Sequence, residues 1–126
     1  EAVQMGTRFV SAAESPVHEN YKNAIVDAAT TGTYVLNKKA SPCIRALKTE
    51  KTARIYEEGL MPPDTFARIL DLYFGGDMEA SVGLAGQTSG LIDSVKPARQ
   101  IIEETVSEFF EITGRLGQCA SAKAFG

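Results

Sequence analysis

The chain opens with alternating apolar and polar positions, which is the pattern of a strand. In residues 2–10 one face carries Val3, Met5, Thr7 and Phe9, and the positions between them hold Gln4, Gly6 and Arg8. This period of two predicts a strand that runs straight into Gly-Thr. Residues 33–36 form a second, shorter β-prone piece, and a Ser-Pro pair then marks a loop before the segment IRAL at residues 44–47.

Most of the remaining chain has the spacing of helices. The pair Ser15-Pro16 predicts a helix start, because serine supplies the cap and proline presets the first turn, and the apolar face that follows ends near residues 30–32. Further helices are expected at residues 52–58 and from the Pro-Pro pair at 62–63 to the Gly-Gly pair at 75–76. Residues 81–92, SVGLAGQTSGLI, are rich in small residues that let a backbone approach another helix or a ligand closely.

The longest predicted helix begins at Pro97. Its apolar stripe comprises Ile102, Val106, Phe109, Thr113 and Leu116, and the expected flexible tail follows Gly117. A lone strand cannot satisfy its backbone donors and acceptors, and these helices offer it no partner. We therefore expect a mostly helical chain whose main sheet is completed by sequence elsewhere.

Composition narrows the function classes without naming one. The net charge is −3, and no basic cluster is denser than Lys38-Lys39, so no nucleic-acid partner is expected. The apolar runs are too short for a membrane span and no signal peptide is evident, which predicts a soluble, cytoplasmic protein. Cys43 and Cys119 lack CxxC spacing and a neighbouring histidine, so we expect free thiols and no metal site.

Two short motifs carry candidate binding chemistry. Gly6-Thr7 after a strand suits a phosphate, since glycine exposes backbone N–H groups and threonine adds a hydroxyl; the alternative is a plain turn. Gly86-Gln87 presents an amide to a planar heterocycle, or else marks a close helix crossing.

For the titratable residues, a structural role is a simpler explanation than catalysis or metal binding. His18 is the one histidine and lies at a helix start, where a polar or capping role competes with catalysis. The acidic run of the last helix, comprising Glu103, Glu104, Glu108 and Glu111, has the offsets of a solvated face rather than a metal cluster.

Four motifs in order give a more specific indication. They are VQMGTRF at residues 3–9, ESPVHENYK at 14–22, IRALK at 44–48 and LAGQTSGLI at 84–92. With these motifs the chain, up to about residue 116, resembles the C-terminal part of the nitronate monooxygenase family, formerly the 2-nitropropane dioxygenases, which includes FMN-dependent enoyl-ACP reductases.

The resemblance implies an α/β fold, the C-terminal fragment of a (β/α)8 TIM barrel with an inserted, mainly helical substrate domain. Residues 1–13 would be the last barrel strand and phosphate loop, 14–92 the inserted domain and return loop, 93–117 the closing barrel helix, and 118–126 a flexible tail. A barrel takes about 250 residues, whereas the chain has 126, so a partial chain is expected.

The same resemblance implies FMN as cofactor, with Gln4, Met5, Gly6 and Thr7 around its phosphate and Gly86 and Gln87 on the flavin or substrate side. The implied substrates are small molecules, an alkyl nitronate or NAD(P)H with an acceptor. The implied catalytic histidine falls in an earlier barrel segment, so no residue here is assigned a catalytic role.

Three functions stay open at the level of sequence. The first is a nitronate monooxygenase-like oxidoreductase, inactive as this fragment alone. An enoyl-ACP reductase or an NAD(P)H:quinone reductase differs from it in acceptor rather than fold, and an independent helical interaction module is the alternative of another class. The oligomeric state stays open.

Overall fold

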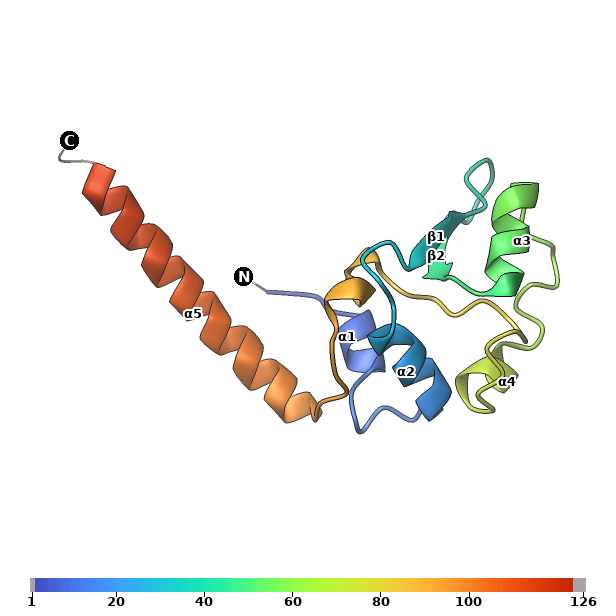
Figure 1. The fold of residues 1–126 in the computed structure, drawn as a ribbon, viewed down its shortest axis with the longest axis horizontal. Helices are drawn as coiled ribbons and strands as arrows, with labels where there is room; N and C mark the ends of the chain where they lie inside the picture. The colour runs from blue at the N-terminus through green and yellow to red at the C-terminus, as the bar shows by residue number, and fades with distance from the viewer. Residues whose placement is uncertain (1, 124–126) are drawn as a thin grey trace.

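The computed structural model describes the backbone of residues 2–123 and the side chains of residues 2–119. The elements follow one another as α1 (Thr7–Val10), α2 (Glu19–Val26), β1 (Thr33–Leu36), β2 (Ile44–Leu47), α3 (Glu50–Glu58), α4 (Ile69–Tyr73), the 3-10 helix η1 (Gln87–Leu91) and α5 (Ala98–Lys123). Every element before α5 gathers into one body, from which α5 extends to one side (Figure 1).

The strand predicted at residues 2–10 is wrong. Thr7–Val10 is the short helix α1, and its first turn closes where the Gly6 carbonyl accepts hydrogen bonds from the N–H groups of Phe9 and Val10. Residues 2–5 lie in neither a helix nor a strand. Strand pairing needs a neighbouring ladder, and the two-stranded sheet of the described residues lies elsewhere in the fold.

The helix start predicted at Ser15-Pro16 is also wrong, because His18 caps the helix instead. Its Nδ1 accepts a hydrogen bond from the N–H of Asn20 at 3.1 Å, and its own N–H donates to the Tyr73 carbonyl. The helix α2 then ends at Val26, earlier than expected. The capping interpretation of His18 is confirmed.

The hairpin of β1 and β2 is the sheet of the described chain. The predicted strand at 33–36 is confirmed, and it pairs antiparallel with Ile44–Leu47, so that Thr33 lies opposite Leu47 and Leu36 opposite Ile44. On one side Leu36, Ala46 and Ile55 form a small core with Val82. These contacts pack the hairpin against α3.

Helix α3 is closed at both ends by its own sequence. Thr49 and Thr52 form a reciprocal capping box at the start, and Gly59 ends the helix with φ 79°. The predicted stop at Gly59 is confirmed. The helix expected after the Pro-Pro pair is shorter than predicted, since only Ile69–Tyr73 is helical.

The glycine-rich segment 81–92 runs through the middle of the body. Tyr21 is fully buried and donates its hydroxyl hydrogen to the carbonyl of Leu84. On the opposite side the segment pairs with β2, where the N–H of Leu47 donates to Gly83 and that of Ala85 to Arg45. The expected close approach of a backbone at these small residues is confirmed.

The long predicted helix is confirmed as α5, with two differences. It continues past Gly117 to Lys123, so the flexible tail predicted at residues 118–126 is wrong for 118–123, while 124–126 lie outside the described residues. Its apolar stripe is exposed rather than packed, with Ile102 53% and Phe109 57% accessible. Cys43 and Cys119 are free and exposed, as expected.

The packing of segment 81–92 predicts a strong effect for Gly90→Ala. A Cβ at Gly90 would collide with the backbone of Thr30, whereas a Cβ at Gly6 would meet nothing within 4 Å. We expect Gly90→Ala to lower the free energy of unfolding by about 2 kcal/mol or more, as overpacking does. Chemical denaturation with Gly6→Ala as control checks this, and equal stabilities of the two variants would contradict the packing.

Candidate functional site

The turn into α1 leaves its backbone donors open. The N–H groups of Gly6, Thr7 and Arg8 have no acceptor among the described residues, as is usual in the first turn of a helix. Gly6 has φ −95° and open space where a Cβ would be, so neither backbone strain nor packing requires glycine there. Three amide donors therefore lie beside a position that a ligand atom can approach closely.

The hydroxyl of Thr7 joins this turn to the glycine-rich segment. Its Oγ1 accepts a hydrogen bond from the N–H of Gly86 at 2.8 Å, across 79 residues of sequence. The carbonyl of Gly86 in turn accepts from the hydroxyl of buried Ser89 at 2.7 Å. Because the Thr7 hydroxyl acts as acceptor here and has no acceptor of its own among the described residues, its hydrogen is free for a ligand.

A cavity of about 690 Å³ opens at this junction, and we call it the amino-terminal cavity. Five of the six predicted site residues line it, namely Gln4, Met5, Gly6, Thr7 and Gly86. Arg8, Lys96 and the first turns of α5 complete the wall. The structure thus brings together residues from the start of the chain, the glycine-rich segment and the last helix.

Gln87 does not join them. It is exposed and lines a separate hollow beside the β1–β2 hairpin, with Thr33 and Tyr34 among its neighbours. The glycine-rich segment therefore divides at Gly86, so that consecutive residues serve different surfaces.

The charged side chains around the amino-terminal cavity lie on two sides, one beside Gly6 and Thr7 and one beside α5. Arg8 donates to the carbonyl of Ser94 at 2.7 Å and to the Ser11 hydroxyl at 3.4 Å, which holds its guanidinium beside the open amides. On the α5 side Glu104 receives hydrogen bonds from Lys96 and Gln100, and these lower the pKa of that carboxyl. The positive wall is the one that carries Gly6 and Thr7.

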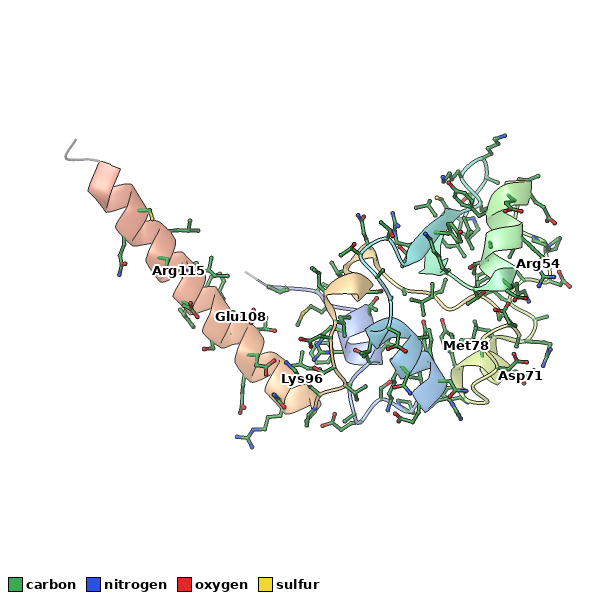
Figure 2. The ribbon with its side chains drawn as sticks, viewed as in Figure 1. Arg54, Asp71, Met78, Lys96, Glu108 and Arg115 are labelled. Atoms are coloured by element: carbon green, nitrogen blue, oxygen red, sulfur yellow. The ribbon has the colours of Figure 1, made fainter. Side chains whose placement is uncertain are left out.

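Asp93 is one of three carboxylates that line this cavity, with Glu104 and Glu108. The hydrogen bond from the Ser94 hydroxyl lowers its pKa first, and the charge of Lys96 lowers it further. Asp93 and Glu104 are therefore held ionised by neighbouring donors and charges. Figure 2 labels Lys96 just before α5 and Glu108 farther along it.

The donor set fits a phosphate group. Three open amides, one hydroxyl hydrogen and one guanidinium lie on the same wall, and such donors bind phosphate oxygens through charge-assisted hydrogen bonds. Sequence reasoning missed Arg8, although a cation directly after Gly-Thr was a readable signal. It also missed Lys96, whose place depends on how the chain returns to α5.

The acidic run of α5 is a solvated helix face only in part, because Glu104 and Glu108 line the amino-terminal cavity. Glu103 pairs with Arg99 on exposed surface, whereas Glu104 pairs with Lys96 at the partly buried wall of the amino-terminal cavity. In the part of the chain that the structure describes, no three His, Cys, Asp or Glu side chains gather to hold a metal ion. No helix within that part has the length and apolar character that a membrane crossing needs.

Known proteins resemble this chain in sequence and in fold. A family model described as nitronate monooxygenase matches residues 1–108. The solved structure of FabK from Thermotoga maritima superposes with a TM-score of 0.85 at 38% identity, over 94% of this chain and 40% of that one. A point variant of FabK from the same organism gives 0.80 at 39% identity, over 94% and 37%.

The chain thus spans well under half the length of the FabK structures that it matches. No protein in the curated set gave a match. The family model covers most of the chain and agrees with the motif order read from the sequence. The chain therefore belongs to the nitronate monooxygenase family.

Proposed function

We propose that this chain is the C-terminal part of an FMN-dependent oxidoreductase that acts on a small-molecule substrate in the cytoplasm. Family membership supports an oxidoreductase. The match to only 37–40% of the FabK chains supports a larger whole, in which preceding sequence supplies the other barrel strands. Residues 2–5 would then pair as the last strand, which explains why their strand-like pattern lacks a partner here.

The amino-terminal cavity is the proposed phosphate end of the flavin site. Bound FMN would supply the redox chemistry, accepting electrons from substrate and passing them to oxygen or another acceptor. The N–H groups of Gly6, Thr7 and Arg8, the Thr7 hydroxyl and the Arg8 guanidinium would bind and orient the phosphate. The observation that carries this proposal is the Thr7–Gly86 hydrogen bond of 2.8 Å, because it fixes the hydroxyl beside three open amides.

Two reactions fit this proposal. Oxidation of alkyl nitronates is the first, and the family description supports it. Reduction of an enoyl thioester is the second, and the FabK neighbours support it to the same degree. An NAD(P)H:quinone reductase would share the same fold and cofactor.

Steady-state assays of the full-length protein with nitronate, quinone and enoyl thioester separate these reactions. We expect a turnover with nitronate or enoyl thioester that exceeds the quinone rate by about tenfold or more, since the acceptor sets the transition-state contacts. A full-length protein that purifies without yellow flavin absorbance and does not take up added FMN would contradict all three.

Gly6→Ala tests the proposed phosphate approach. A methyl group at this position meets no protein atom within 4 Å, so the free energy of unfolding should change by less than about 1 kcal/mol. A phosphate close to the backbone would meet that methyl group, and we expect FMN affinity to fall by about tenfold, equivalent to 1.4 kcal/mol. Titration of full-length apoprotein with FMN, followed by flavin fluorescence, measures this; unchanged affinity would rule out the approach at Gly6.

Thr7→Val and Thr7→Ser test the hydroxyl. Valine keeps the shape but leaves the Gly86 N–H without its acceptor, which should cost about 1 kcal/mol in stability and speed hydrogen exchange at that amide. Serine keeps the hydroxyl and should exchange as the parent protein does. Slow Gly86 exchange in both variants would show that the Thr7–Gly86 bond does not hold the site together.

A further inference from the structure

A second hollow, of about 350 Å³, lies beside the hairpin, and we call it the hairpin hollow. Lys38, Arg45 and Lys48 line it together with Tyr34 and Tyr56. It shares no lining residue with the amino-terminal cavity. Arg45 alone of its three cations also lines a hollow with Gly6, Thr7 and Gly86 of the proposed phosphate site.

Two tyrosine rings and two ammonium groups form a ladder at its wall. The rings of Tyr34 and Tyr56 stack with centroids 4.5 Å apart and an angle of 22° between their planes. Lys48 lies over the Tyr34 ring, with its Nζ 4.8 Å from the centroid, and Lys38 lies over Tyr56 at 4.5 Å. Such cation–π contacts restrict lysine side chains that otherwise move freely.

Backbone and side-chain hydrogen bonds position the residues of this ladder. The N–H of Lys48 donates to the carbonyl of Gly32 at 3.0 Å, and Tyr34 lies opposite Ala46 in the hairpin register. Lys38 also donates to the Tyr56 hydroxyl at 3.4 Å, which joins the hairpin loop to α3. Both lysines are exposed, and these contacts favour positions of the two ammonium groups beside the hollow.

The third cation is Arg45, which donates from Nη1 to the hydroxyl of Thr33 at 2.9 Å. No carboxylate lines the hairpin hollow, and none of its three cations forms an ion pair with another described residue. Acidic residues line the hollows that share a lysine with it: Glu57 and Glu58 with Lys38 in one, and Asp27, Glu50 and Glu79 with Lys48 in the other. In a chain whose net charge is −3, three uncompensated cations around one hollow are a concentrated positive field.

We propose that the hairpin hollow binds the diphosphate of an organic ligand, the ADP portion that reduced nicotinamide dinucleotides and CoA have in common. Three cations match the two to three negative charges of a diphosphate. The hydroxyls of Thr30 and Thr31 and the amide of Gln87 line the same hollow and supply neutral hydrogen bonds for a sugar. The volume is at the small end of ligand pockets, which suits part of a ligand rather than the whole.

This assignment gives Gln87 a role that differs from the flavin contact expected from the sequence. The amide of Gln87 would meet the ligand in the hairpin hollow, while Gly86, one residue earlier, faces the flavin phosphate. Diphosphate binding is argued from the hollow's own residues. That the ligand is the electron donor or the thioester substrate of the enzyme rests on the proposed function.

The test is calorimetric titration of the full-length protein, as purified, with ADP. We expect Lys38→Gln/Lys48→Gln to weaken binding by about tenfold or more, because two charge-assisted contacts are lost. Arg54→Gln is the matched control for Lys48→Gln, since each removes one positive charge; Arg54 comes from α3 and does not line the hollow (Figure 2). Higher ionic strength should weaken binding to the parent protein more than to the double variant.

Each outcome decides the proposal. Unchanged ADP affinity in the double variant overturns it, as does a loss in Arg54→Gln equal to that in Lys48→Gln, which would indicate a general charge effect. If circular dichroism shows that the double variant is unfolded, Lys48→Gln alone replaces it, because that side chain is exposed. Competition of NADH or of CoA with ADP identifies the source, and failure of both to compete overturns the proposal.

The readout is independent of the flavin. ADP binding needs neither turnover nor bound FMN, and flavin content is measured separately by absorbance. A protein that binds ADP through Lys38 and Lys48 but holds no flavin would keep this site and refute the proposed function. A protein that contains flavin and is active, but whose ADP affinity the double substitution leaves unchanged, would keep the proposed function and refute this site.

Discussion

The burial of Tyr21 determines how the rest of this fold is arranged. Its ring lies against Gly83, where an added Cβ would come within 2.9 Å of the tyrosine Cε2, and its hydroxyl holds the Leu84 carbonyl. Burial, together with neighbouring Tyr73, raises the pKa of this tyrosine, so it stays protonated as a donor. With the hydroxyl bound, the glycine-rich segment is held between α2 and β2.

Both proposed binding surfaces depend on that segment. At Gly86 it presents an N–H to Thr7 and completes the amino-terminal cavity, and at Gln87 it turns to the hairpin hollow. Gly86 is the extended residue before the 3-10 helix η1 and Gln87 is its first residue, and this change of backbone conformation lets the two line different hollows.

Local signals in the sequence predicted local structure. Residues 33–36, the stop at Gly59 and the long helix after Pro97 were predictable, because each depends on neighbours a few residues away. Both Ser15 and His18 have side chains that can cap α2. His18 caps it because its backbone N–H donates to the carbonyl of Tyr73, which is distant in sequence. The strand at residues 2–10 failed for a related reason, since a strand pattern without a partner ladder does not form a strand.

The candidate site was predictable in part. Gly6, Thr7 and Gly86 were found from their chemistry, and their meeting in one cavity follows from a contact that spans 79 residues, which no local pattern encodes. Arg8 was overlooked beside them. The cations of the hairpin hollow are dispersed along residues 38–48 and gather only when the hairpin closes and Tyr34 stacks on Tyr56.

The exposed stripe of α5 is consistent with the same account. Its apolar residues, Ile102, Val106, Phe109 and Leu116, are each at least half accessible, which is unusual for so regular a pattern. In the proposed full-length enzyme this face would pack against the barrel, and residues 2–5 would find a neighbouring strand. The unpaired start and the bare helix then have one common cause.

The most direct test of the central claim is a crystal structure of the full-length protein with FMN. The account predicts phosphate oxygens about 3 Å from the backbone nitrogens of Gly6, Thr7 and Arg8, within hydrogen-bonding distance. A flavin whose phosphate is bound elsewhere, with these three amides still open, would contradict it.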